Sequence, residues 1–179
     1  MNCNKATPMS RKQICRLIHY IKKKAGLENE LYFPIVPFVE NILPMMFDDY
    51  QFEISTIEEM GNKHGETFPN SNIIRIREDI YIRAAKGEGR DRMTIAHEVG
   101  HFFLHEKDSI SLCRIAPGEK LKPYEDPEWE ANAFGGELLA SSYLIRNLNA
   151  NDVVEKCGVT YEAAFIQLEH CMDSFFEIF

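Results

Sequence analysis

His97, Glu98 and His101 form a His-Glu-x-x-His motif inside an apolar, helix-forming run from Met93 to Leu104. On a helix, residues four apart lie on one face with Cβ atoms roughly 6 Å apart. Two imidazoles at this spacing can bind one Zn²⁺ ion, with Zn–N bonds of about 2.1 Å. Glu98 lies about 100° around the helix from His97, where it can serve as the general base for a hydrolytic water. The motif therefore predicts the zinc site of a metallopeptidase.

A competing interpretation is a surface helix that carries two solvated histidines and a glutamate in a salt bridge. The motif, however, lies in one of the most apolar segments of the chain. Burying two unpaired histidines there would cost free energy, and a bound metal removes that cost. The apolar setting favours the metal site.

A catalytic zinc usually has three protein ligands and one open position. His105 is on the same predicted helix, but eight residues place it about 12 Å from His97 along the axis. We therefore expect His105 to orient a ligand or to be structural. A metzincin site would need a histidine six residues after His101, where Lys107 stands instead. The third ligand must come from another segment.

A second predicted helix begins at Asp126 and Pro127, which suit the N-cap and the first helical position. It offers two carboxylates, Glu128 and Glu130, about 200° apart around the axis, so that only one can face the metal. Glu128 shares its face with Asn132, which could hydrogen-bond to a zinc-binding imidazole. We favour Glu128 over Glu130. The alternative is that either acid only complements the helix dipole.

The stretch His-Glu-Val-Gly-His-Phe-Phe-Leu-His, followed by Glu-Trp-Glu-Ala-Asn-Ala-Phe and a later Leu-Leu pair, resembles the ImmA/IrrE family of zinc metallopeptidases. The resemblance implies an α+β, zincin-like fold, with a small mixed β-sheet packed on the HExxH helix and additional helices. It implies that His97, His101 and Glu128 are zinc ligands and that Glu98 is the general base. The similarity in element order extends roughly from Asn72 to His170.

Two departures from the family pattern follow the ligands. Gly135-Gly136 replaces the usual Ala-Ala, and Ala140-Ser141 replaces the frequent Met-Pro. The two glycines would let the second helix approach the motif helix closely. Both departures concern the substrate side of the site rather than the metal.

The composition is that of a globular protein, with 45% hydrophobic and 27% charged residues in 179. We expect a single domain over residues 1–179, with a family-variable part at 1–70 and a catalytic core at 71–170. The five cysteines are scattered, which favours free thiols in a reducing compartment. We see no apolar leader and no apolar run long enough to span a bilayer. These features predict a cytoplasmic protein without membrane association. The net charge of −8 argues against a general polyanion binder.

Helices are predicted at residues 10–25 and 37–46, the second ended by Pro44, and a strand at 51–57. Residues 72–77 and 79–83 are predicted to be two strands joined by a tight turn, or one strand with a break. Residues 61–72 read as a loop. The motif helix should run from about Arg92 to Glu106 with Asp91 as its N-cap, and a long connection should follow to Asp126. Further helices are expected at 126–140, 153–158 and 160–172, the last capped by Thr160.

The family resemblance implies a regulator that cleaves or otherwise inactivates a repressor-type transcription factor, a helix-turn-helix protein of a mobile element or a stress response. Our principal hypothesis is zinc-dependent hydrolysis of a peptide held as an added strand on the exposed sheet edge. The residue that stabilises the oxyanion stays open among His64, His105, Tyr124 and Tyr143.

Two other functions compete with hydrolysis. The chain could be a zinc-containing binding protein that docks a repressor without cutting it. Alternatively, its last helix pair could bind DNA, but Lys156 is the only Lys or Arg between Asn147 and His170, and Glu155, Glu162 and Glu169 oppose phosphate contact. Direct nucleic-acid binding is therefore disfavoured.

Overall fold

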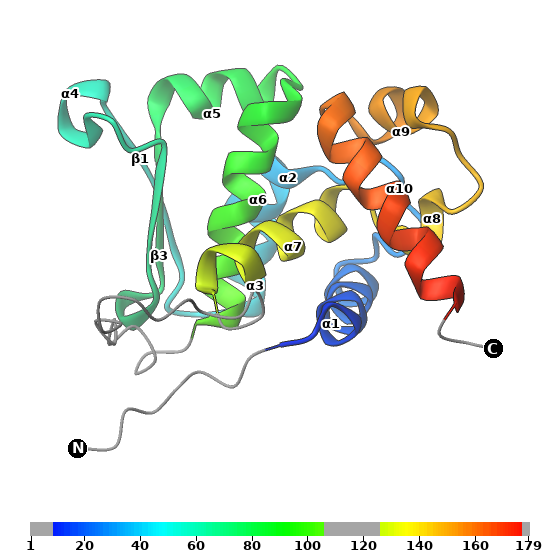
Figure 1. Cartoon of the computed structure of the whole chain (residues 1–179). Coiled ribbons are helices and arrows are strands. Elements are labelled where there is room, and N and C mark those ends of the chain that lie inside the picture. The colour runs from blue at the N-terminus through cyan, green and yellow to red at the C-terminus, as the bar shows by residue number, and fades with distance from the viewer. Residues whose placement is uncertain (1–8, 106–125, 177–179) are drawn as a thin grey trace, which may run out of the picture.

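A computed structural model describes residues 9–105 and 126–176, and the side chains of 9–105 and 126–171. In these ranges the fold is α+β, a three-stranded mixed sheet combined with helices (Figure 1). The first third contains α1 (Arg11–Lys24), α2 (Ile35–Pro37), the π-helix η1 (Phe38–Ile42) and α3 (Leu43–Met46). The middle contains β1 (Gln51–Ser55), α4 (Ile57–Met60), β2 (Gly65–Phe68), the 3₁₀ helix η2 (Pro69–Ser71), β3 (Ile73–Arg77), α5 (Glu78–Ala85) and α6 (Gly89–Leu104). The last part contains α7 (Pro127–Leu139), α8 (Ser142–Ile145), α9 (Ala150–Cys157) and α10 (Tyr161–Phe176).

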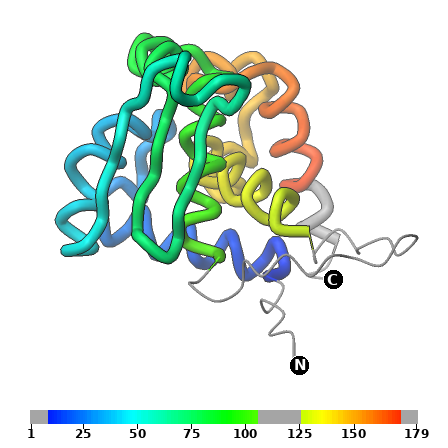
Figure 2. Tube along the Cα trace, turned by 90° about the vertical axis from the view of Figure 1, so that its left-hand side faces the viewer, coloured from blue at the N-terminus to red at the C-terminus, as the bar shows by residue number. Residues whose placement is uncertain are grey.

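The sheet has the order β1-β3-β2, with β1 parallel and β2 antiparallel to the central β3. In β3, Ile74 and Ile76 are fully buried, while the alternating Arg75 and Arg77 are partly exposed. This alternation is that of a sheet with one face on the core. The sheet covers one side of α6 and leaves β2 at an edge (Figure 2).

The motif helix α6 lies at the centre of the molecule. The sheet lies on one side of it, α7 crosses it, and α9 and α10 lie on the other side (Figure 1). Ile95 and Val99 of α6 and Phe134 of α7 are fully buried between these layers. Burial of these side chains holds the helix that carries the motif in the core.

Glycines allow α6 and α7 to pack closely. A Cβ added at Gly100 would lie 3.0 Å from both the Cα and the carbonyl oxygen of Ala131. One added at Gly135 would lie 3.2 Å from the backbone nitrogen of His97. Gly136 faces the side chain of Gln167 on α10 instead. The expected close approach therefore involves Gly135 and the motif's own glycine, whereas Gly136 does not face α6.

Several predicted elements are confirmed. Ser10 caps α1 in a reciprocal pair with Gln13, and the Asp126 carboxylate accepts the Glu128 N–H at the start of α7. The Thr160 hydroxyl accepts the N–H of Ala163, as expected of the cap of α10. Strands β1 and β3 occupy the predicted positions.

The predicted strand at 79–83 is wrong, because these residues belong to helix α5. Ile80 and Ala84, four residues apart, form its buried face, whereas Ile82 is exposed. Arg83 reaches Asp79 one turn earlier on the same helix. The alternation of Ile80 and Ile82 therefore predicted a strand wrongly. The buried pair is Ile80 and Ala84, four residues apart, as on one face of a helix.

Three further expectations are corrected. The region 61–72 is not all loop, because residues 65–68 form β2 by pairing with β3. Asp91 is not the N-cap of the motif helix, because that helix starts at Gly89, after Glu88. The buried carboxylate of Asp91 instead accepts two hydrogen bonds from Arg83, at 2.8 and 3.0 Å. Pro44 does not end a helix but stands at the second position of α3, which continues from η1 to Met46.

Among the described residues, no helix combines the length and the apolar character that crossing a membrane requires.

The contact at Gly100 can be tested by adding a side chain there. We expect Gly100→Val to destabilise the protein by about 2 kcal/mol or more, because the new atoms meet the backbone of α7 rather than a movable side chain. The control Ala85→Val, at an exposed helical position, should cost less than about 1 kcal/mol. Urea unfolding midpoints compare the two, and equal losses would contradict the close packing.

Candidate metal centre

Three side chains from two helices converge at one point. His97 and His101, one turn apart on α6, bring their Nε2 atoms to 2.9 Å from each other. Glu128, in the first turn of α7, places Oε2 3.2 Å from Nε2 of His97 and Oε1 3.4 Å from Nε2 of His101. Glu128 is exposed and the two imidazoles are partly buried, so the cluster is open to solvent on the side of Glu128.

These separations fit the geometry of a metal site. Two ligand atoms that are each about 2.1 Å from one ion at a tetrahedral angle lie about 3.4 Å apart. The observed separations of 2.9, 3.2 and 3.4 Å are close to that value. Two imidazoles and one carboxylate are also a donor set that zinc accepts in catalytic sites. The three residues could therefore hold one metal ion.

Hydrogen bonds on the far side of each imidazole determine where its proton lies. Nδ1 of His97 is 3.0 Å from Oδ1 of Asn132, which can only accept, so Nδ1–H donates and Nε2 carries a lone pair. His105 donates its Nε2–H to the Glu130 carboxylate at 3.4 Å and accepts at Nδ1 from His101, 2.9 Å away. His101 is therefore also unprotonated at Nε2.

Both Nε2 lone pairs point at each other across 2.9 Å. Such lone pairs repel unless a cation lies between them. Burial, together with the neighbouring His97 and His105, lowers the pKa of His101 to about 3, so His101 itself is a poor carrier of an extra proton. A divalent metal satisfies both nitrogens at once, and the residues present fit it.

Glu98 lies beside this cluster and faces the sheet. It is buried, and its Oε2 accepts a hydrogen bond from the Thr67 hydroxyl at 2.7 Å. Burial raises the pKa of the Glu98 carboxyl, although the hydrogen bond from Thr67 acts in the opposite direction. Gly65 makes room for this side chain, because a Cβ there would lie 2.6 Å from Cγ of Glu98. Strand β2 thus positions the carboxylate.

The remaining candidates from the sequence lie elsewhere. Glu130 is buried and bonded to His105 and to the backbone N–H of Met9, so it is not in the cluster. Tyr143 donates its hydroxyl to the carbonyl of Glu28, outside the site. His64 is exposed at the start of β2, and Tyr124 lies outside the described residues. Both ring nitrogens of His105 are engaged, which leaves it no proton for an oxyanion.

Thr67 and Gly65 were not foreseen, although both contact Glu98. They lie in the segment that reads as a loop, since a strand of four residues that begins with Gly65 and is followed by Pro69 gives almost no alternation signal. Only the pairing of β2 with β3 places them next to α6.

The mixed sheet packs on a helix that carries the His-Glu-x-x-His motif, and a glutamate from α7 completes the cluster of possible metal ligands. This combination defines a zincin-like domain of the metallopeptidase class. Residues 51–170 match the model of the Peptidase_M78 family, described as the IrrE N-terminal-like domain, and the chain belongs to this family. The match confirms the resemblance to the ImmA/IrrE peptidases and extends from β1 into α10. Comparison with curated proteins finds no match.

Membership of this family indicates a peptidase-type function with a metal cofactor, and the three converging side chains are where the described residues could bind that metal.

Replacing one imidazole tests the cluster. We expect the purified protein to carry about one divalent metal ion per chain, and His97→Ala to lose it, because two remaining donors bind weakly. His19→Ala removes an exposed histidine of α1 and should leave the metal content unchanged. Elemental analysis after dialysis measures both. Retention of a full metal equivalent by His97→Ala would rule out the cluster.

The hydrogen bond from His97 to Asn132 can be tested separately. Asn132→Ala removes the acceptor that holds the imidazole in its metal-binding tautomer, so we expect metal affinity to fall by about 10- to 100-fold. Competition with a chromogenic chelator gives the affinity. Asn147→Ala, at an exposed position after α8, is the matched control and should not change it.

Proposed function

We propose that this chain is a zinc-dependent metallopeptidase that hydrolyses peptide bonds in a protein substrate. The observation that carries the proposal is the convergence of two unprotonated Nε2 atoms and the Glu128 carboxylate beside the buried Glu98. His97, His101 and Glu128 would hold the zinc. When bound, zinc would polarise the scissile carbonyl and lower the pKa of water.

Glu98 acts as the general base. It accepts a proton from the attacking water and delivers it to the leaving amine, as a carboxylate next to the reacting atoms can do. Its raised pKa makes it a better proton acceptor than an exposed carboxylate. The hydroxyl of Thr67 holds Oε2 in place, so that the side chain does not swing away between the two transfers.

The substrate would bind in extended form along β2. Among the residues that the structure describes, this strand pairs with β3 on one side only, and it packs against α6, next to Glu98. An added strand would satisfy the backbone groups of that edge. It would also bring the scissile bond over the base.

The proposed substrate is a repressor-type transcription factor of the helix-turn-helix kind, from a mobile element or a stress response, met in the cytoplasm. Its support is the family resemblance together with the chain's net charge of −8, which favours partners that carry basic surfaces. DNA-binding proteins present such surfaces.

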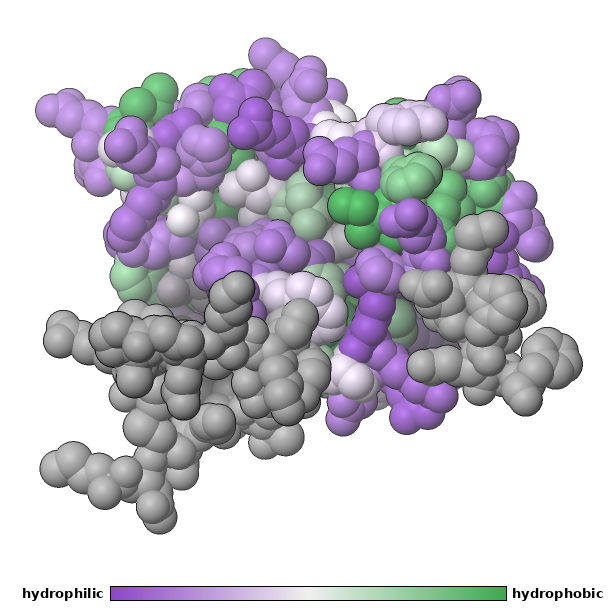
Figure 3. Space-filling model, in the orientation of Figure 1, coloured by the Kyte–Doolittle hydropathy of each residue, from purple (hydrophilic) through white to green (hydrophobic). Residues whose placement is uncertain are grey.

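A second candidate function is docking of the same partner without cleavage. It is favoured by α10, which exposes Tyr161, Phe165 and Ile166. Apolar side chains gather over this helix on an otherwise largely hydrophilic face (Figure 3). Isolated exposed apolar residues are common, but a cluster is a possible contact surface.

Replacing the base separates the two functions. Glu98→Gln should keep the metal and lower the rate of peptide-bond cleavage by about 10²- to 10⁴-fold, because the amide cannot accept the water proton. Fragment masses after incubation with a candidate repressor measure cleavage, and elemental analysis measures the metal. The exposed Glu58→Gln on α4 is the matched control. Cleavage by Glu98→Gln at the parental rate would contradict the mechanism, whereas a bound and intact repressor with the parental chain would favour docking.

A further inference from the structure

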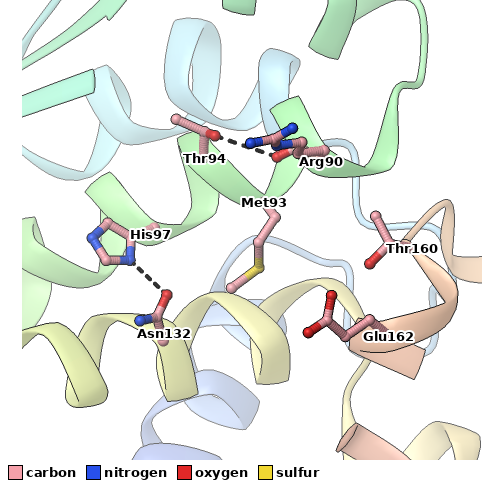
Figure 4. A pocket seen from close by; sticks show the side chains of 7 residues that line it. All are labelled: Arg90, Met93, Thr94, His97, Asn132, Thr160 and Glu162. Atoms are coloured by element: carbon pink, nitrogen blue, oxygen red, sulfur yellow. Dashed lines mark hydrogen bonds between the residues drawn. The ribbon is translucent and has the colours of Figure 1, made fainter. Parts of the chain in front are cut away.

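A cavity of about 510 Å³ opens beside His97, on the side away from Glu98 and β2. It lies between the first half of α6, the middle of α7 and the start of α10 (Figure 4). Its volume is in the range of small-molecule sites and is ample for a long side chain. Nothing in the proposed hydrolytic mechanism uses this cavity.

His97 joins the cavity to the candidate metal centre. Its Nε2 faces His101 and Glu128, while its Nδ1 donates to Asn132, whose side chain also lines the cavity. The imidazole ring is therefore a wall between the two spaces. A peptide that lies across the metal-binding atoms would bring a neighbouring side chain to the mouth of the cavity.

The walls of the cavity differ in chemistry. The thioether of Met93 points into it from α6, and the carboxylate of Glu162 and the hydroxyl of Thr160 point toward the same space from α10 (Figure 4). The side chain of Glu162 has no ion-pair partner among the residues that the structure describes, and it is exposed to solvent. One wall is thus apolar and the opposite wall carries an unpaired negative charge.

We propose that this cavity is a specificity pocket for a Lys or Arg side chain of the substrate, close to the scissile bond. The aliphatic stem would pack on Met93, and the cationic group would bind the Glu162 carboxylate and the Thr160 hydroxyl. The inference rests on the proposed peptidase function and names the substrate side chain that it prefers. A basic side chain agrees with a DNA-binding substrate, since phosphate contacts require Lys and Arg.

Arg90 also lines the cavity and would favour an acidic side chain instead. In Figure 4, however, its guanidinium lies near Thr94, at the opposite side of the view from Glu162. The carboxylate of Glu162 faces the open space next to Met93. Of the two charged groups, the one directed at the space beside Met93 is therefore the carboxylate of Glu162.

Cleavage-site profiling tests the pocket. The metal-loaded chain is incubated with a synthetic library of random decapeptides, and the cut sites are read by mass spectrometry. We expect Lys and Arg to be enriched at one fixed position near the scissile bond. Glu162→Lys should reduce cleavage of those peptides by about tenfold or more and favour Asp or Glu there instead. The control Glu169→Lys makes the same charge change at an exposed position of α10 outside the cavity and should keep the parental preference.

A binding measurement gives a second readout that does not depend on turnover. Two labelled decapeptides, identical except for Lys or Glu at the enriched position, are titrated with metal-loaded Glu98→Gln, and fluorescence anisotropy reports their affinities. The Lys peptide should bind about tenfold more tightly, and Glu162→Lys in the same background should remove the difference.

The outcomes distinguish the pocket from the peptidase function. Cleavage without a basic preference, or a preference that Glu162→Lys leaves unchanged, would overturn the pocket alone. A preference for acidic residues would assign the cavity to Arg90 and would also overturn it. If the metal-loaded chain cuts neither the library nor a candidate repressor, the peptidase function fails and the pocket with it.

Discussion

The contact between α6 and α7 is the constraint on which the candidate site depends. His97 and His101 come from one helix and Glu128 from the other, so the three donors meet only if the two backbones lie close together. Gly100 meets the backbone of Ala131, and Gly135 meets that of His97. A Cβ at either glycine would be in tighter contact than side chains usually make, so the opposing backbone would have to shift by a few tenths of an ångström. The glycine inside the motif is thus a packing requirement, and the geometry of the donors is its consequence.

Buried polar groups around this contact set the chemistry of each imidazole. Asn132 holds the proton of His97 at Nδ1, and the chain from Glu130 through His105 does the same for His101. Glu130, which is not in the cluster, therefore influences it indirectly, by orienting His105, which in turn fixes the proton of His101. On the other side, Gly65 of β2 leaves room for the Glu98 side chain of α6, and Thr67 holds its carboxylate with a hydrogen bond. The sheet and the second helix thus supply different groups to one centre.

Elements with strong local signals were predictable. Ser10 and Asp126 cap their helices as their residue types indicate, and the HExxH helix is where its apolar run places it. The errors fall where neighbours outweigh the local pattern. The residues around Ile80 alternate like a strand but bury a helical face, and β2 has no pattern of its own because its partner β3 creates it. Asp91 resembles a cap but is a buried partner of Arg83.

By itself the sequence determined the motif, its helix and the pairing of His97 with His101, because side chains four apart on a helix share a face whatever surrounds them. It also indicated Asn132 as a partner of a ligand imidazole. It favoured Glu128 over Glu130, because Glu128 shares a helix face with Asn132, but spacing alone says only that the two acids point apart. The tertiary structure turns Glu128 toward His97 and His101 and buries Glu130 behind His105. The rotation of α7 about its own axis, set by its packing on α6, is a long-range property that no local pattern contains.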